Sequence, residues 1–350
     1  MKLRVLTEGL EDMRLEGRGD REITGISYDS RQVRPGDLFV AIEGFRTDGH
    51  LYLEEAGEKG AVAVVVELGR ELPSGLAEEM EVARTSNTRK ALALLSDRFR
   101  GHPSGRLKLV GVTGTNGKTT THLVEAAMDR VGIISGLVGT VVYRIAGKEL
   151  PVERTTPESA DLQELLASMV DAGCEVASME VSSHALALDR VTGCEFAVSV
   201  FTNLSQDHLD FHDDMQDYFH TKTRLFLPFG EGGLGAKASA VNVDDPYGRR
   251  LVDMVSGRVL TYGREEGADL RGELLQAGLK RSRVAVTYEG RHMEGETALT
   301  GSFNLYNILA AVGASILLEV EVEKALAGIL SYPGVPGRFE AVDEGQDFAV

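Results

Sequence analysis

The sequence contains only two cysteines, Cys174 and Cys194, and no Cys-x-x-Cys pair. Both lie in apolar stretches, so we expect reduced core thiols rather than a disulfide or a thiolate zinc site. The N-terminus lacks the apolar core of a signal peptide, and the longest clean apolar run, residues 61–66, is far too short to span a bilayer. The sequence therefore predicts a cytoplasmic protein without membrane insertion.

Positive charge is also scarce, because 37 Lys and Arg stand against 54 Asp and Glu, for a formal net charge of −17. Such an acidic chain is a poor general binder of nucleic acid or anionic membrane. An anionic substrate would need a local cluster of cations or a metal ion. The chain is otherwise close to the globular average, at 43% hydrophobic and 26% charged residues, which excludes wholesale disorder.

The 350 residues suggest two or three domains at ~100–200 residues per domain. In the first part, residues 37–42 and 61–66 are typical of buried strands, with a helix over residues 51–60 between them. From residue 106, strands alternate with polar loops and helices; we expect strands over 107–112, 175–181, 196–202 and 239–243, and helices over 119–131, 161–172 and 304–318. This alternation predicts an α/β fold, with an N-terminal α/β domain over residues 1–88 and a central domain with a mostly parallel sheet over residues 89–338.

The sharpest local signal is a phosphate-binding loop. Residues 110–120 read Val-Gly-Val-Thr-Gly-Thr-Asn-Gly-Lys-Thr-Thr, so that an apolar strand runs into a glycine-containing loop and then into a helix. Gly114 and Gly117 let the backbone curl until successive N–H groups point at phosphate oxygens, and the helix N-terminus adds its dipole. Lys118 can reach the β- and γ-phosphates, and the Thr119 hydroxyl can ligate magnesium.

Polar side chains follow the next two predicted strands of the central domain. In open parallel sheets, ligands bind at the carboxyl ends of the strands, so these side chains should face the phosphate loop across one crevice. Glu180 and His208 could complete a magnesium site begun by Thr119, although a histidine ligand is unusual for magnesium. Lys222 lies in a predicted helix over residues 218–226, and by composition alone it is a surface lysine.

Together these segments resemble the Mur ligase family, which builds the peptide stem of bacterial cell-wall precursors. The phosphate loop reads Gly-Thr-Asn-Gly-Lys-Thr-Thr as in that family, and further blocks follow in the family's order at residues 179–184, 201–210, 301–307 and 334–340. The resemblance covers nearly the whole chain. It implies a phosphate-loop ATPase domain that uses ATP and Mg²⁺.

The N-terminal segment is similar to the members of the family that add the third amino acid of the stem, through Asp29-Ser30-Arg31, residues 35–41, Gly44 and Asp48-Gly49. This implies an ATP-dependent amide ligase that adds a diamino acid to the D-glutamyl γ-carboxylate of UDP-N-acetylmuramoyl-L-alanyl-D-glutamate through an acyl phosphate. In the family meso-diaminopimelate is the commoner diamino acid and lysine the alternative. Residues 1–88 would bind the UDP-muramoyl substrate. Residues 339–350 would start a C-terminal domain that is otherwise absent, so we expect this chain, a monomer, to be incomplete for turnover by itself.

The resemblance also implies roles for individual residues. The uridine nucleotide would be bordered by Tyr28, Ser30, Phe45, Arg46 and Thr47, and the muramoyl dipeptide by Thr155, Thr156, Ser182 and Arg190. ATP would contact Gly114, Thr115, Asn116, Gly117, Lys118, Thr119 and Thr120, with Asn307 at the adenine and Arg338 at the phosphates. Catalysis and metal binding would fall to Lys118, Thr119, Glu180, His208 and Lys222. Lys222 matches a family lysine that carbon dioxide carbamylates, giving N6-carboxylysine, which would support a second magnesium with His208.

Alternatives from other classes remain open at this point. One is a related amide ligase, such as a folylpolyglutamate synthetase or another stem-peptide ligase, although Asp29-Ser30-Arg31 argues against the folate enzyme. Another is a phosphate-loop GTPase, but the region expected to hold an Asn-Lys-x-Asp guanine motif lacks it. A third is a non-catalytic fragment that binds UDP-muramoyl peptide, because the chain ends at Val350.

Overall fold

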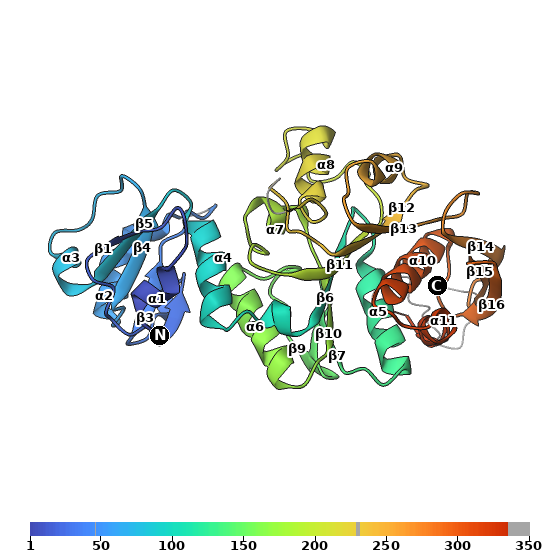
Figure 1. Ribbon diagram of the computed structural model, residues 1–350, viewed down its shortest axis with the longest axis horizontal. Helices are drawn as coiled ribbons and strands as arrows, with labels where there is room; N and C mark the ends of the chain where they lie inside the picture. Colours follow the sequence, from blue (N-terminus) through green and yellow to red (C-terminus); the bar gives the residue numbers. More distant parts are fainter. Residues whose placement is uncertain (46, 229–231, 335–350) are drawn as a thin grey trace. The chain divides into compact units, whose positions relative to one another are not determined.

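The computed structural model describes residues 1–45, 47–228 and 232–334 (Figure 1). The predictions for Arg46, Arg338 and residues 339–350 lie outside the described residues. The chain divides into two compact units. The N-terminal unit comprises Met1–Pro103, Pro157–Ala167 and Leu188–Cys194, and the central unit comprises Ser104–Thr156, Ser168–Ala187 and the residues from Glu195 onward.

The N-terminal unit is built on a five-stranded sheet in the order β1-β5-β4-β3-β2. Only the edge strand β1 runs antiparallel to its neighbour β5, and the other pairs are parallel. Its strands are β1 (Arg14–Glu16), β2 (Gly25–Ser27), β3 (Asp37–Val40), β4 (Ala63–Glu67) and β5 (Glu81–Thr85). Its helices are α1 (Leu3–Thr7), α2 (Leu53–Glu58), α3 (Leu76–Glu79) and α4 (Thr88–Phe99), with short 3₁₀ turns η1 (Ser30–Gln32) and η2 (Gly49–Tyr52). A third 3₁₀ turn, η3 (Pro103–Arg106), falls where the chain passes from the first unit to the second.

Both faces of this sheet are buried, each in its own core cluster. Successive side chains of a strand point to opposite faces, so neighbouring residues enter different clusters. Leu38 and Val40 pack in one core cluster, whereas Phe39 packs in the other. The apolar face of α4 joins the first cluster through Ala91, Leu92 and Leu95. By packing, α4 therefore belongs to the N-terminal unit, just beyond the boundary that we predict at residue 88.

The central unit contains an eleven-stranded sheet in the order β16-β15-β14-β13-β12-β11-β6-β10-β7-β8-β9 (Figure 1). Its middle, from β14 to β7, is parallel, whereas β15, β16, β8 and β9 are added antiparallel at the edges. The predicted α/β class with a mostly parallel sheet is thereby confirmed. The strands are β6 (Lys108–Thr113), β7 (Ser135–Val138), β8 (Tyr143–Ile145), β9 (Lys148–Leu150), β10 (Val176–Glu180), β11 (Phe196–Phe201), β12 (Ala238–Asn242), β13 (Arg258–Gly263), β14 (Leu270–Gln276), β15 (Ser282–Tyr288) and β16 (Arg291–Thr297).

Helices α5 (Lys118–Arg130), α10 (Ser302–Leu317) and α11 (Val322–Ser331) pack against one another beside this sheet (Figure 1). Their main core cluster includes Leu123, Val124, Ile308, Val312 and Ile329, all buried. This packing holds α5, whose first turn follows the phosphate loop, on a rigid support. The remaining helices are α6 (Ser159–Asp171), divided between the units, α7 (Ser183–Ala187), α8 (Met215–Thr223) and α9 (Pro246–Val252).

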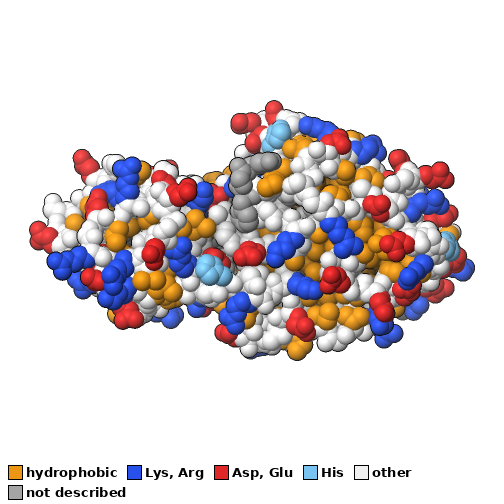
Figure 2. Space-filling view, viewed as in Figure 1, with side chains coloured by type: hydrophobic (Ala, Val, Ile, Leu, Met, Phe, Trp, Pro, Cys, Tyr) orange, Lys and Arg blue, Asp and Glu red, His pale blue; other side chains and the backbone are white. Residues whose placement is uncertain are grey.

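Three features of the structure bear on the composition of the chain: its surface charges, the length of its helices and its two cysteines. On the face drawn in Figure 2, acidic and basic side chains are interspersed. Among the described residues, no helix is both long and apolar enough to cross a membrane. Cys174 and Cys194 are buried free thiols, as their apolar sequence surroundings predict.

Candidate nucleotide and substrate site

The phosphate loop connects the end of β6 to the start of α5 and is fastened to the segment that follows β11. The Thr115 N–H donates to the Asn203 carbonyl oxygen (2.9 Å), and the Asn116 N–H donates to Asn203 Oδ1 (3.0 Å). The Thr202 hydroxyl donates to the carbonyl oxygens of Thr113, at 3.3 Å, and of Asn116. The residues after β11 therefore shape the loop, as the rule that polar groups gather at strand ends predicts.

Two glycines give the loop its curvature. Gly114 and Gly117 have φ angles of +157° and +144°. A Cβ added to Gly117 would lie 2.7 Å from Thr202 Cγ2 and 2.8 Å from Thr202 Oγ1. The loop thus needs a residue without a side chain at this point, both for its dihedral angles and for the close approach of Thr202.

We expect Gly117→Ala to lower the free energy of unfolding by about 1–3 kcal/mol, because it adds backbone strain and a clash. It should also weaken nucleotide binding, because Thr202 must move away from the loop. Gly132→Ala is the matched control, since Gly132 also has a positive φ, +76°, but no heavy atom within 4 Å of an added Cβ. Thermal unfolding and calorimetric titration with ADP would test this; equal losses in both variants would contradict it.

Lys222 is buried, with 2% of its surface exposed, so the interpretation as a surface lysine is wrong. Its Nζ donates to Thr113 Oγ1 (3.2 Å) and to the Gly114 carbonyl oxygen (3.1 Å), and it lies 4.8 Å from the centre of the Tyr218 ring. Helix α8 is therefore pinned to the phosphate loop through this amine. Burial, together with the charge of Lys118, lowers the pKa of Lys222 to about 7, although the carboxylate of Asp207 acts in the opposite direction.

Glu180 is the last residue of β10 and is also buried. Its two carboxylate oxygens accept hydrogen bonds from the N–H and the hydroxyl of Thr140, at 2.9 and 2.7 Å. The Thr140 hydroxyl also lies 3.1 Å from that of Thr155. The Thr156 hydroxyl donates to the Glu180 carbonyl oxygen (2.7 Å) and accepts from the Ser182 N–H (3.2 Å). The predicted metal ligand and three predicted dipeptide contacts thus come together at one strand end.

His208 lies in a cluster of aromatic rings after β11. Its ring centre is 5.1 Å from that of His184 and 6.1 Å from that of Tyr218. The His184 ring stacks on Phe211 at 4.0 Å. The His208 side chain is 43% exposed, and its Nε2 lies 3.6 Å from Asp207 Oδ2. It is therefore accessible to a ligand while its neighbours limit its movement.

The described residues contain no cluster of three or more His, Cys, Asp or Glu side chains that could hold a metal ion by themselves. This fits magnesium that arrives with a nucleotide, because Mg²⁺ bound with a nucleotide takes most of its oxygen ligands from phosphate and water and needs only one or two protein carboxylates. The metal ligands predicted from the sequence, Thr119, Glu180 and His208, therefore stay a prediction.

Asn307, the predicted adenine contact, lies in the first turns of α10. Asn307 Oδ1 accepts from the Thr120 hydroxyl (3.3 Å), and Asn307 Nδ2 donates to Asn304 Oδ1 (2.9 Å), so α10 is joined to α5 beside the phosphate loop. The Tyr306 hydroxyl donates to Asp244 Oδ2 (2.8 Å), and burial together with this carboxylate raises the pKa of Tyr306 to about 12. Asp244 directly follows the predicted strand over residues 239–243, but it was not among the predicted site residues.

The predicted uridine contacts lie in the N-terminal unit. The Tyr28 hydroxyl donates to Asp161 Oδ2 (2.6 Å), and the Ser30 hydroxyl donates to Glu55 Oε2 (3.0 Å). Phe45 is 74% exposed in a tight turn that is closed by a hydrogen bond from the Gly44 N–H to the Thr47 carbonyl oxygen (2.9 Å). An aromatic ring with this much exposed surface can stack on a planar base.

Arg190, a predicted dipeptide contact, also lies in the N-terminal unit. Its Nε lies 3.3 Å from Glu158 Oε2. The sequence analysis missed this buried carboxylate, because nothing in the Thr-Thr-Pro-Glu segment shows which side chain it will meet.

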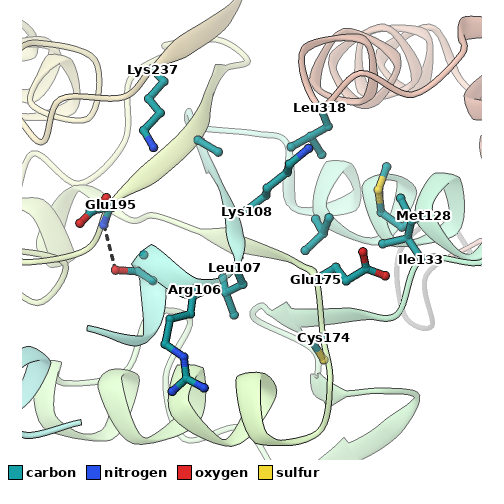
Figure 3. Close-up of a pocket in the computed structure, with 14 residues that line it drawn as sticks. Arg106, Leu107, Lys108, Met128, Ile133, Cys174, Glu175, Glu195, Lys237 and Leu318 are labelled. Atoms are coloured by element: carbon teal, nitrogen blue, oxygen red, sulfur yellow. Dashed lines mark hydrogen bonds between the residues drawn. The ribbon is translucent and has the colours of Figure 1, made fainter. Parts of the chain in front are cut away.

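A separate cavity of about 430 Å³ lies at the opposite ends of the central strands, where Lys108 opens β6 and Val176 opens β10 (Figure 3). Arg106, Lys108 and Lys237 line it together with Glu175 and Glu195. In the close-up, the Arg106 and Lys108 side chains point in different directions rather than at one centre. None of the predicted site residues lines this cavity.

Comparisons with known proteins extend over the whole chain. One family model, described as the Mur ligase middle domain, matches residues 112–315, and a second, described as the Mur ligase family catalytic domain, matches residues 22–100. The UDP-N-acetylmuramoyl-L-alanyl-D-glutamate–2,6-diaminopimelate ligase of Bacillus licheniformis is 41% identical over 355 residues, which cover 100% of this chain and 71% of that enzyme. The ligase of the same name from Geobacter sulfurreducens is 43% identical and covers 98% and 67%.

Solved structures show the same fold. A UDP-N-acetylmuramoyl-L-alanyl-D-glutamate–2,6-diaminopimelate ligase superposes with a TM-score of 0.81 at 24% identity, covering 98% of this chain and 69% of that one. A MurF ligase from Thermotoga maritima, in complex with ADP, superposes with a TM-score of 0.64 at 21% identity, covering 92% and 69%.

Proposed function

Because this chain belongs to the Mur ligase family, we propose that it binds UDP-N-acetylmuramoyl-L-alanyl-D-glutamate and ATP and joins 2,6-diaminopimelate to the D-glutamyl γ-carboxylate. The family resemblance predicted from the motif blocks is confirmed, and with it the class of ATP-dependent ligases. The observation that carries the specific proposal is 41% identity to a ligase of that name over the full length of the chain. As such a ligase it would work in the cytoplasm, as a monomer, on a soluble nucleotide-linked precursor.

The reaction needs an activated carboxylate. An oxygen of the γ-carboxylate attacks the γ-phosphorus of ATP. The bond between the γ-phosphorus and the oxygen that bridges it to the β-phosphorus breaks, ADP departs, and the substrate becomes an acyl phosphate. The amine of the diamino acid then attacks the acyl carbon, loses a proton, and phosphate departs with its bonding electrons. Because anionic groups meet in both steps, the main demand on the protein is to offset negative charge.

Lys118 and the backbone N–H groups of the phosphate loop are the parts of this chain suited to that demand. Lys118 opens α5, so its ammonium and the helix N-terminus act on the same phosphates. Mg²⁺, held by Thr119, Glu180 and His208, would add Lewis-acid neutralisation of the γ-phosphoryl group. Thr155, Thr156 and Ser182 would hold the dipeptide, since their hydroxyls lie around the Glu180 strand end.

We further propose that Lys222 reacts with carbon dioxide in the active enzyme. The amine nitrogen attacks the CO₂ carbon, a proton leaves, and the product is an anionic carbamate in place of a cation. Burial of Lys222 against the phosphate loop supports this proposal, because a buried ammonium so close to Lys118 costs free energy that an anion beside Mg²⁺ does not. The carbamate would then support a metal ion with His208.

Calorimetric titration tests the substrate assignment on this chain. UDP-N-acetylmuramoyl-L-alanyl-D-glutamate should bind at least about tenfold more tightly than UDP-N-acetylmuramoyl-L-alanine, because only the first carries the D-glutamyl carboxylates. Product masses after incubation with ATP, Mg²⁺ and either 2,6-diaminopimelate or lysine would then identify the diamino acid. Equal affinity for the two UDP-sugars would contradict the proposal.

A further inference from the structure

A buried carboxylate in the N-terminal unit joins two groups of predicted substrate contacts. Glu158 is 3% exposed, and its Oε2 lies 3.3 Å from both Arg89 Nη1 and Arg190 Nε. The two arginine side chains are themselves only 17% and 12% exposed. Opposite charges at this spacing attract one another strongly, because they are shielded from water, so removing one of them weakens the placement of the others.

The first arginine supports the turn that carries Phe45. Arg89 Nη2 donates to the Glu43 carbonyl oxygen (2.8 Å), and Glu43 pairs with Asp48 across the base of that turn. One guanidinium therefore contacts both the turn and Glu158. A guanidinium has five N–H donors in a rigid fork, so a single arginine can make both contacts, whereas lysine cannot reproduce them.

The second arginine is the predicted dipeptide contact. Glu158 forms an ion pair with Arg190 on its Nε side, so the buried carboxylate restricts where this guanidinium can lie. The neighbouring Asp189 is held in turn: it has a positive φ of 55° and accepts a hydrogen bond from Asn87 Nδ2 (3.1 Å). Asn87 caps the N-terminus of α4, two residues before Arg89. The start of α4 thus supports both the turn that carries Phe45, through Arg89, and the segment that carries Arg190, through Asn87.

We propose that Arg89 and Glu158 are positioning residues of the UDP-muramoyl-dipeptide site. They couple the turn that carries Phe45, a predicted uridine contact, to Arg190, a predicted dipeptide contact. This inference rests on the proposed function. Neither residue needs to touch the substrate. Arg89 orders the turn and Glu158 orders Arg190, and the ion pair between them makes the two parts of the site depend on each other.

Substitutions of Glu158 and Arg89 should affect substrate binding differently. Titration with UDP and with UDP-N-acetylmuramoyl-L-alanyl-D-glutamate can distinguish the two effects. Glu158→Gln should raise the Kd of the full substrate by about 10- to 100-fold and the Kd of UDP by a smaller factor, because Arg89 loses its ion pair but still donates to the Glu43 carbonyl oxygen. Arg89→Met should raise both Kd values, since it also releases the turn. Glu158→Asp should recover part of the affinity, because it restores the charge.

Glu125→Gln is the matched control, since Glu125 is equally buried, pairs with Arg144 and lies in the central unit. It should leave both Kd values unchanged. Should Glu158→Gln fail to fold, Glu158→Asp and Arg89→Lys test the same two contacts, with smaller expected losses of affinity. Wild-type affinity for the full substrate in the folded Glu158 and Arg89 variants would overturn the inference. Failure of the wild-type chain itself to bind the full substrate would instead overturn the proposed function, and this inference with it.

Discussion

Lys118→Ala is expected to weaken ATP binding by about 100-fold, with the fold intact. Lys118 is the first residue of α5 and is half-buried behind Gly117. It is also the cation whose charge helps lower the pKa of Lys222. Removing it takes away the positive charge nearest to the expected phosphates but leaves no apolar cavity, so the loss should fall on binding and catalysis rather than on stability.

Calorimetric titration of the variant with ATP and Mg²⁺ measures this loss directly. UDP-N-acetylmuramoyl-L-alanyl-D-glutamate should still bind, because the predicted uridine contacts and Arg190 lie in the N-terminal unit. Lys108→Ala is the matched control, since Lys108 is a 55% exposed lysine at the start of β6, the strand that leads into the phosphate loop. Unchanged ATP affinity in the Lys118 variant would show that the lysine does not bind phosphate.

Lys222→Met is expected to remove the carbamate completely, while the protein becomes more stable at neutral pH. Methionine fills nearly the same volume but cannot form a carbamate. The stability gain follows from the amine: its pKa is about 7 in the folded chain against an ordinary value of 10.5. Between these values the unfolded chain binds more protons than the folded chain, so wild-type stability rises with pH. The advantage of the variant should therefore be largest at and below pH 7 and should vanish towards pH 10.5.

Two measurements separate the chemical role of Lys222 from its effect on stability. Under ¹³C-labelled carbon dioxide, the wild-type chain should show a carbamate carbon resonance that is absent from Lys222→Met and retained in the control Lys237→Met, which changes an exposed lysine. Denaturant unfolding from pH 7 to 10 should show the predicted convergence of stabilities. A wild-type chain without the resonance, or a variant that ligates normally, would contradict the carbamate proposal.

Much of the nucleotide site could be predicted because its signals are local or follow a general rule of parallel sheets. The phosphate loop is one continuous strand, loop and helix, in which Gly114, Gly117 and Lys118 can be assigned from their spacing alone. Glu180 was predicted because polar groups at the carboxyl ends of parallel strands collect at one edge. Thr202 and Asn203 meet the loop for the same reason, and their hydrogen bonds to it confirm that placement.

The edges of the large sheet could not be predicted in the same way. The antiparallel strands β8, β9, β15 and β16 are short or half-exposed, with burial patterns that alternate weakly. Their pairing depends on which neighbour is already present at the sheet edge, and that is a property of the assembled sheet rather than of any segment.

The sequence by itself determined the fold class, the phosphate loop and the family, because each depends on contiguous residues or on motif blocks in a set order. Only the tertiary structure decided that Lys222 is buried, since its amine meets Thr113 across 109 positions of the chain. Likewise, Glu158 meets Arg89 across 69 positions of the chain. The residues that surround Lys222 and Glu158 in the sequence do not indicate that Thr113 and Arg89 will be their partners. The burial and charge partners of a side chain depend on long-range packing, which no local pattern encodes.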